Sequence, residues 1–374
     1  MWVLWFLILA VLASVPAAAY VGYKVGRRYP QAALWDPLWI RAYGNRPIDP
    51  NGPHEGFWLA GYYVDYDRAS LEMVRHTAEQ MDQIVIFGYG LEKDGTVTGR
   101  DQEIIRGVTG PTKRVLLFAN LTNGAFSQEV AHAILTDPAA QEKAIRGILG
   151  KCSMLGVAGV QIDFENIAAS DRAAFTAFLK KLKQALSEQD LTLSVAVPAK
   201  TWDETTGWGG ATDYAALGQI ADQLYIMAYD EHFRGSEPGP IASLKWTEQV
   251  IRYATGKIPA QKIVLGVPFY GYEWTADPKG DPKTNRAYGV QALAQRVADA
   301  KGTVKWDAAA GENVATYKTD EGERIAWYPD QRSIEAKLKL AYQYNLKGVS
   351  LWRLGFEPEE WWEEMGNFRL HPTK

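Results

Sequence analysis

The sequence lacks the residues that build metal centres and disulfide cross-links. Cys152 is the single cysteine among 374 residues, so no disulfide can form within the chain and no thiolate cluster can bind a metal. The five histidines are scattered, without the close pairing of a zinc-binding helix. We therefore expect Cys152 to be a buried free thiol and the protein to hold no metal ion.

Signatures of nucleotide and nucleic-acid binding are missing as well. The chain has no phosphate-binding Gly-Lys-Ser/Thr loop and no Gly-x-Ser-x-Gly elbow, and Gly88-Tyr-Gly90 is too short for a dinucleotide fingerprint. A net charge of −4 and a pI near 5.9 give no electrostatic basis for binding nucleic acid or an anionic membrane surface. We exclude both as partners.

A long apolar run opens the chain. Trp2 to Tyr23 could span a membrane, and Ala17-Ala18-Ala19 offers a cleavage site of small residues. Basic residues follow the run at 24–28 but do not precede it, which in an uncleaved anchor favours a cytoplasmic C-terminus. For residues 1–30, a cleaved signal peptide and a retained membrane anchor both stay open, beside a buried helix. We expect a secreted or membrane-anchored protein that acts outside the cytoplasmic membrane.

Beyond an irregular linker at residues 31–56, short apolar runs alternate with longer amphipathic stretches. This alternation is typical of a parallel sheet whose strands are joined by helices. Helices are predicted at 70–80, 127–133, 138–155, 170–188, 214–220, 244–254 and 332–344. Strands are predicted at 58–64, 83–89, 114–120, 159–165, 192–198, 223–229, 262–270 and 348–353.

Eight strands alternating with helices favour an eight-stranded β/α barrel over an open doubly wound sheet. We assign the barrel to residues 57–374. About sixty residues between the seventh strand and the last helix exceed a single crossover. They hold a predicted helix at 290–300 and a hairpin of 314–318 against 324–328. We expect a small α+β insertion at about residues 277–329, and a monomeric protein.

The fourth predicted strand carries polar side chains at every second position. Gln161, Asp163 and Glu165 alternate with apolar residues, so the three share one face of the strand. A half-exposed strand with this face in water is one interpretation. Two carboxylates on the inward face of a core strand are the other, and they require a chemical reason because buried charges are expensive.

The other strand ends decide between these interpretations. Working residues of β/α barrels lie at the C-terminal ends of the strands. Carboxylates, phenols and an indole gather there, as a sugar ring requires. The residues at these ends are Tyr62, Tyr63, Phe87, Tyr89, Asn120, Asp163, Glu165, Pro198, Lys200, Met227, Tyr229, Asp230, Tyr270, Trp352 and Arg353.

Three segments resemble the signatures of family 18 glycoside hydrolases, the chitinase-like enzymes. They are Gly159-Val-Gln-Ile-Asp-Phe-Glu165, Met227-Ala-Tyr-Asp230 and the strand of Trp352, in the family's order. The resemblance runs from about residue 61 to 360 and implies an eight-stranded β/α barrel. Asn120-Leu and Gly124-Ala-Phe-Ser127 make the chain most similar to bacterial spore-cortex and cell-wall N-acetylglucosaminidases.

The resemblance also implies roles for the site residues. Glu165 would be the general acid, Asp163 would orient the substrate's acetamido group, and Tyr229 would hydrogen-bond its carbonyl oxygen. No cofactor is implied. The remaining substrate-binding candidates are Tyr62, Gln161, Met227, Asp230 and, as the floor of the site, Trp352.

The chain departs from the family pattern at two positions. Ala158 and Gln161 stand where the family usually has aspartate. An amide at Gln161 can donate a hydrogen bond to Asp163 but cannot exchange a proton with it. The cell-wall branch often carries an amide there, so we interpret the change as a feature of that branch.

We expect a retaining, substrate-assisted hydrolase of β-linked N-acetylglucosamine polymers, with peptidoglycan favoured over chitin. Endo and exo cleavage both stay open. A non-catalytic carbohydrate-binding protein on the same barrel is the alternative from another class. A hydrolase of another acetamido-sugar exopolysaccharide is the third interpretation.

Overall fold

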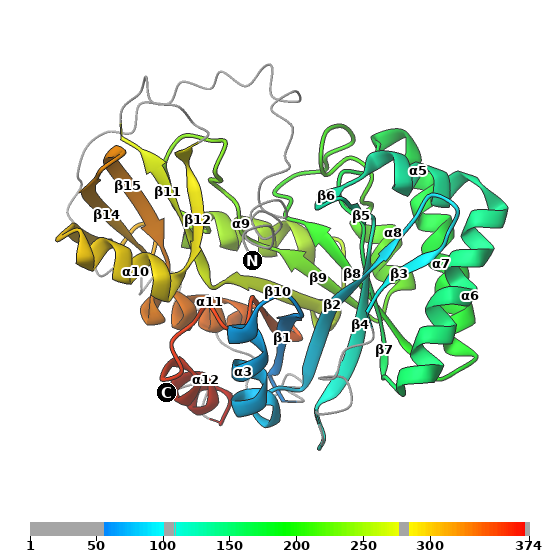
Figure 1. Cartoon of the computed structure of the whole chain (residues 1–374). Helices are drawn as coiled ribbons and strands as arrows, with labels where there is room; N and C mark the ends of the chain where they lie inside the picture. Colours follow the sequence, from blue (N-terminus) through cyan, green and yellow to red (C-terminus); the bar gives the residue numbers. More distant parts are fainter. Residues whose placement is uncertain (1–55, 101–107, 109, 277–283, 371–374) are drawn as a thin grey trace.

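A computed structural model describes residues 56–100, 108, 110–276 and 284–370 (Figure 1). The predictions for residues 1–30, and for all of the linker except residue 56, lie outside these residues. Within the described ranges, no helix is long and apolar enough to cross a membrane.

Eight parallel strands form a closed barrel, as predicted. Their order is β1-β16-β10-β9-β8-β7-β4-β2, and pairing of β1 with β2 closes the ring. A short strand, β3 (Val97–Gly99), pairs antiparallel with β2. The barrel strands are β1 (Trp58–Val64), β2 (Gln83–Leu91), β4 (Lys113–Ala119), β7 (Gly159–Asp163), β8 (Thr192–Pro198), β9 (Gln223–Met227), β10 (Ile263–Pro268) and β16 (Gly348–Trp352).

Two strands that carry site residues, β7 and β9, end two residues earlier than predicted. β7 ends at Asp163 because the next backbone groups turn to a side chain, and the N–H of Glu165 donates to Asn120 Oδ1 at 3.0 Å. β9 ends at Met227, where the N–H of Ala228 turns back to the carbonyl of Ile226 at 2.8 Å. Glu165 and Tyr229 therefore stand on the loops that follow the strands.

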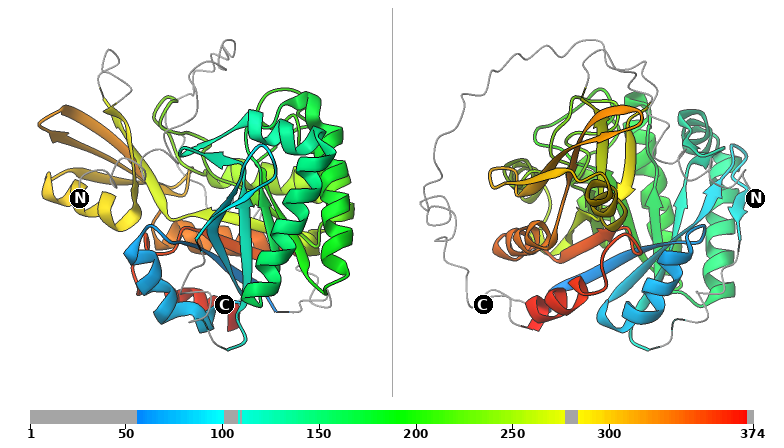
Figure 2. Two further views of the ribbon diagram at one scale, coloured as in Figure 1. Left: turned by 45° about the vertical axis from the view of Figure 1, so that its right-hand side comes forward. Right: turned by 60° about the vertical axis from the view of Figure 1, so that its left-hand side comes forward.

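Helices surround the barrel on its outer side (Figures 1 and 2). A hairpin of β5 (Leu121–Thr122) and β6 (Ala125–Phe126) follows β4. Three short 3₁₀ turns, η1 (Ala78–Gln80), η2 (Ala169–Asp171) and η3 (Ala260–Lys262), complete the connections. The helices are α3 (Arg68–Thr77), α5 (Gln128–Thr136), α6 (Pro138–Leu155), α7 (Arg172–Ser187), α8 (Tyr214–Ile220), α9 (Leu244–Thr255), α11 (Gln331–Gln343) and α12 (Trp361–Leu370).

Helix α7 buries an apolar stripe against the barrel. The helix was predicted from residue 170 and begins two residues later, after Asp171. The Asp171 carboxylate lies 2.9 Å from His132 Nδ1 on α5 and caps no backbone N–H. The stripe consists of Phe175, Phe178, Leu179 and Leu182.

The core has an outer layer, between strands and helices, and an inner layer inside the barrel. Val160 and Ile162 of β7 point to the outer layer, which also holds the buried thiol of Cys152, as predicted. Tyr62 and Tyr225 belong to the inner layer. All five residues of β7 are buried, so the interpretation of a half-exposed strand is wrong.

The insertion is a second, antiparallel sheet of order β12-β11-β15-β14-β13 that lies to one side of the barrel (Figure 2). It begins at Tyr270, directly after the barrel strand and earlier than the predicted residue 277. The predicted strand 262–270 divides at Pro268, which has no N–H to continue the ladder. The last bond between β10 and β16 runs from Phe269 N–H to Trp352 O at 2.7 Å. The elements of the insertion are β11 (Tyr270–Thr275), β12 (Arg286–Gly289), α10 (Val290–Asp299), β13 (Thr303–Asp307), β14 (Glu312–Thr319) and β15 (Gly322–Tyr328).

Candidate active site

The predicted site residues gather at the C-terminal end of the barrel. They come from β1, β7, β9 and β16 and from the loops after β7 and β9. Tyr62 contacts both Gln161 and Trp352, while Tyr229 lies within electrostatic reach of the three carboxylates. Met227 ends β9 and is half-buried, opposite Pro198 in the register. The three carboxylates are Asp163, Glu165 and Asp230.

Asp163 presents an unused hydrogen-bond acceptor at the end of β7. The residue is only 5% exposed, and its Oδ1 is buried without a hydrogen-bond partner among the described residues. Burial raises the pKa of Asp163 to about 7 because the charged form loses its hydration. Since buried acceptors are almost always satisfied, this atom indicates a place for a donor from outside the chain.

Glu165 stands two residues further along, on the loop after β7. The residue is half-buried. Burial raises the pKa of Glu165 well above its ordinary value, and the charges of Asp163 and Asp230 raise it further. A raised pKa favours the protonated carboxyl, the form that a general acid needs.

Asn120 fixes the backbone of this acid. Its fully buried side chain donates from Nδ2 to the carbonyl of Glu165 at 2.8 Å and accepts from the N–H of Glu165 at 3.0 Å. It also donates to the carbonyl of Ser127 at 2.9 Å. The sequence placed Asn120 at a strand end but did not reveal this positioning role, which depends on the pairing of β4 with β7.

Gln161 forms a different hydrogen-bond chain from the one predicted. Its Oε1 accepts from the Tyr62 hydroxyl at 2.8 Å, and its Nε2 donates to Ser194 Oγ at 3.2 Å. The expected bond from Gln161 to Asp163 is not among the hydrogen bonds of these two described side chains. The amide therefore orients Tyr62 and leaves Asp163 without that partner.

Aromatic rings line the same end of the barrel. Trp352 meets Tyr62 edge-to-face, with ring centroids 5.1 Å apart, and meets Phe87 at 5.9 Å. Tyr229 meets Tyr270 at 6.0 Å in the same manner. The Tyr229 ring packs over Gly266 of β10, where an added Cβ would lie 3.0 Å from Cε1. The hydroxyl of Tyr229 keeps its proton because burial and the neighbouring carboxylates raise its pKa.

Asp230 accepts hydrogen bonds from two tyrosine hydroxyls of the insertion. Tyr270 and Tyr272 of β11 both donate to its Oδ1, the second at 3.0 Å. Desolvation beside the two rings raises the pKa of Asp230 to about 6, against the lowering effect of these hydrogen bonds. Sequence reasoning did not identify Tyr272. The alternation of Tyr270, Tyr272 and Trp274 on one strand face was the available signal.

The residues that the structure describes include no group of three or more His, Cys, Asp or Glu side chains that could hold a metal ion. The side chains at the site are carboxyls, phenols, amides and an indole. Together they combine a carboxyl whose pKa is raised, a buried acceptor and flat apolar rings. This combination suits the acid-assisted cleavage of a bond in a sugar polymer.

Comparison with known proteins identifies relatives of the whole barrel. The family model of glycosyl hydrolases family 18 matches residues 59–357. The putative sporulation-specific glycosylase YdhD of Bacillus subtilis is 33% identical over 352 residues, which cover 88% of this chain and 83% of YdhD.

Solved structures agree with this assignment. The spore cortex-lytic enzyme SleL of Bacillus megaterium superposes with a TM-score of 0.75 at 28% identity, covering 83% of this chain and 73% of SleL. A chitinase from Chromobacterium violaceum gives the same TM-score and identity and covers 83% of this chain and 99% of its own. The chain is a glycoside hydrolase, related to spore cortex-lytic enzymes and chitinases, and belongs to glycosyl hydrolases family 18.

Proposed function

We propose that the enzyme cleaves β-linked N-acetylglucosamine polymers with retention of configuration, and that the substrate's own acetamido group is the nucleophile. The observation that carries this proposal is the buried, unpartnered Oδ1 of Asp163. A 2-acetamido group has one N–H, which can supply the missing donor. A carboxylate that accepts this hydrogen bond orients the amide oxygen towards the anomeric carbon.

The first chemical step uses the proton on Glu165. The acetamido oxygen attacks C1 as the bond from C1 to the leaving oxygen breaks, and the Glu165 carboxyl delivers its proton to that oxygen. The product is a cyclic oxazolinium ion, whose positive charge lies beside the ionised Asp163. The Tyr229 hydroxyl donates to the acetamido oxygen and holds it in line.

The second step returns the enzyme to its starting state. Water attacks C1 on the face that the leaving group vacated, the bond from C1 to the acetamido oxygen breaks, and the Glu165 carboxylate takes the proton of the water. Two inversions at C1 give overall retention. Glu165 is suited to donate the proton in the first step because its pKa is raised well above the ordinary value.

Peptidoglycan is favoured over chitin as the polymer. Support comes from the relatives, one named a sporulation-specific glycosylase and another a spore cortex-lytic enzyme. The apolar N-terminal run supports an enzyme that is secreted or membrane-anchored and works outside the cytoplasmic membrane, where a wall polymer lies. We propose that the enzyme acts there as a monomer.

The test is mass spectrometry of the products formed from purified peptidoglycan and, separately, from chitin oligosaccharides. We expect new reducing N-acetylglucosamine ends with peptidoglycan, and activity about 10²–10⁴-fold lower for Glu165→Gln. Proton NMR during the first minutes should show the β-anomer of the product. A thiazoline analogue of the cyclic intermediate should inhibit cleavage.

Each other outcome rejects a defined part of the proposal. An α-anomer as first product would exclude retention. Cleavage of chitin alone would reverse the order of the two polymers. Tight binding of both polymers without cleavage, by the parent and by Glu165→Gln alike, would indicate a carbohydrate-binding protein on this barrel.

A further inference from the structure

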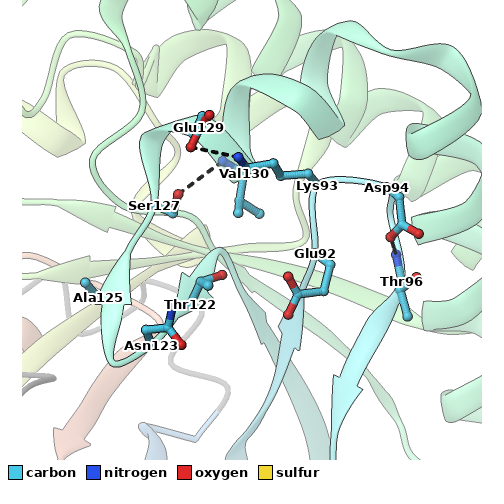
Figure 3. A pocket seen from close by; sticks show the side chains of 10 residues that line it. All are labelled: Glu92, Lys93, Asp94, Thr96, Thr122, Asn123, Ala125, Ser127, Glu129 and Val130. Carbon is cyan, nitrogen blue, oxygen red and sulfur yellow. Dashed lines mark hydrogen bonds and ion pairs between the residues drawn. The ribbon is translucent and has the colours of Figure 1, made fainter.

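A polar pocket lies between the turn that joins β2 to β3, the β5–β6 hairpin and the first turn of α5 (Figure 3). Its volume is about 760 Å³. We call it the rim pocket. The side chains that matter for its chemistry are Glu92, Lys93, Asp94, Thr122, Asn123 and Glu129.

The rim pocket is separated from the catalytic acid by a single hairpin. Asn120, which directly precedes the hairpin, forms hydrogen bonds with both the N–H and the carbonyl of Glu165. Asn166, the next residue, donates to the carbonyl of Phe126 in β6 at 3.4 Å. Thr122 and Asn123 at the other end of the hairpin line the pocket. The hairpin therefore joins the backbone that carries Glu165 to the lining of the pocket.

Carboxylates dominate the charge of the rim pocket, and one of them has no cation. Lys93 pairs with Glu129 at 2.8 Å, and Asp94 pairs with Lys143 of α6 at 2.7 Å. Glu92 forms no ion pair with any residue that the structure describes. Its carboxylate points across the pocket towards the hairpin (Figure 3).

A second observation is an unused hydroxyl at the pocket. Thr122 Oγ1 is buried and has no hydrogen-bond partner among the described residues. A hydroxyl can accept as well as donate, so Thr122, the Glu92 carboxylate and the Asn123 amide, which all line the pocket, can each accept a hydrogen bond from a ligand. An ammonium group has three N–H donors and no acceptor, which matches this arrangement.

Other ligand classes fit less well. The excess of carboxylates disfavours an anion. No metal-binding group of three or more His, Cys, Asp or Glu side chains is found in the described part of the chain. None of the described residues that line the pocket is aromatic, so it offers no platform for stacking a sugar ring.

We infer that the rim pocket binds a primary amine carried by the polymer, with Glu92 as its counter-charge, and so selects for amine-bearing substrate. This inference rests on the proposed function. Two chemical sources of the amine are consistent with it: the side chain of a diamino acid in a peptide branch, and an unacetylated amino sugar.

The test compares kcat/KM on peptidoglycan with free amines and on the same polymer after acetylation of its amines with acetic anhydride. For the full parent chain we expect about 10-fold faster cleavage of the amine-bearing polymer, since a hydrogen bond to a charged group is the contact being removed. In Glu92→Gln the ratio should fall to about 1. Glu142→Gln, which removes the same charge from the exposed face of α6, should keep the parent ratio.

A parent ratio of 1, or an unchanged ratio in Glu92→Gln, would overturn the inference. Glycan strands stripped of their peptides by an amidase separate the two sources. Loss of the preference on stripped strands assigns the amine to the peptide. A preference that persists until the sugars themselves are N-acetylated assigns it to the sugar.

If the parent cleaves no polymer, the proposed function fails. The inference about the rim pocket is then tested by binding alone. Titration calorimetry with a soluble disaccharide peptide and with its amine-acetylated form then gives the two affinities. Tighter binding of the free amine that is lost in Glu92→Gln supports the site, and equal affinities reject it.

Discussion

The barrel mouth and the inserted sheet both bury carboxylates, but only the insertion surrounds them with cations. Glu273 of β11 is fully buried, with Arg296 Nε at 2.6 Å, Arg324 Nε at 3.9 Å and the Tyr317 hydroxyl donating to it. At the mouth, Asp163 and Glu165 form no ion pair with any described residue. Burial instead raises their pKa values.

The difference separates a structural carboxylate from a chemical one. A cation at hydrogen-bond distance stabilises the ionised form of a carboxylate. The carboxylate of such a pair therefore stays charged and has a structural role. Without a cation, a buried carboxyl is held less firmly in its charged form, and it can exchange a proton in the physiological range. The carboxyls at the barrel mouth are therefore free to react, whereas the carboxylate of Glu273 stabilises the inserted sheet.

The largest effect is expected from Asp163→Asn, which removes a carboxylate that has no cation. Activity should fall about 10²–10³-fold, because the positive charge of the intermediate loses its counter-charge. The acid limb of kcat/KM against pH should also disappear, since the parent needs Asp163 ionised and its pKa is about 7. Steady-state kinetics between pH 4 and 9 measure both changes.

The same variant should change stability in the opposite sense. Between the ordinary pKa of 3.8 and the folded value of about 7, the folded parent holds a proton that the unfolded chain has released. Stability of the parent therefore falls as pH rises across this window. Asp163→Asn should remove that slope and unfold at a higher urea concentration than the parent at pH 8. A lower midpoint at pH 8 would show that Asp163 is structural.

The barrel and the hairpin of the insertion were predictable because their signals are local. The alternation in β7 placed Gln161 and Asp163 on one face, and the runs at 314–318 and 324–328 predicted the hairpin of β14 and β15. Helix α7 showed its apolar stripe every three to four residues. The start of α7 was predicted two residues too early. Asp171, directly before the helix, contacts His132 of α5 instead of capping α7, and such a contact between distant residues is not visible in the sequence.

The partners within the site were less predictable because they come from distant parts of the chain. Tyr272 reaches Asp230, and Asn120 reaches Glu165, only after the barrel has closed and the insertion has docked. Gln161 was predicted to contact its neighbour on the same strand face, yet it bonds across the barrel to Tyr62. Residue types predicted the chemistry, and tertiary contacts decided how each group is held.

Glu273→Gln tests whether the paired carboxylate of the insertion stabilises the fold. Removing the buried carboxylate takes the ion-pair partner from Arg296 and one of two carboxylates from Arg324, whose guanidinium is fully buried. We expect the free energy of unfolding to fall by about 3 kcal/mol. Urea unfolding at pH 7 measures this change.

Catalysis in Glu273→Gln should change little at 25 °C, since the residue holds the sheet together and contacts no group of the proposed reaction. The control is the parent measured at the same urea concentrations, which separates lost activity from unfolding. A large drop in kcat/KM with unchanged stability would contradict the division between the two regions.

The smallest effect is expected from Arg286→Met, which removes a cation at the surface of the same insertion. Arg286 pairs with Glu321 at 2.7 Å, but the two side chains are 35% and 44% exposed, and Glu321 also binds Arg324 at 2.6 Å. Water solvates both charges of such a pair, so the loss should stay below about 1 kcal/mol. Urea unfolding in low and high salt should show that even this small loss decreases as salt screens the pair. A loss as large as that of Glu273→Gln would mean that burial does not set the strength of these ion pairs. The distinction between paired carboxylates of the insertion and unpaired carboxyls of the barrel mouth would then be wrong.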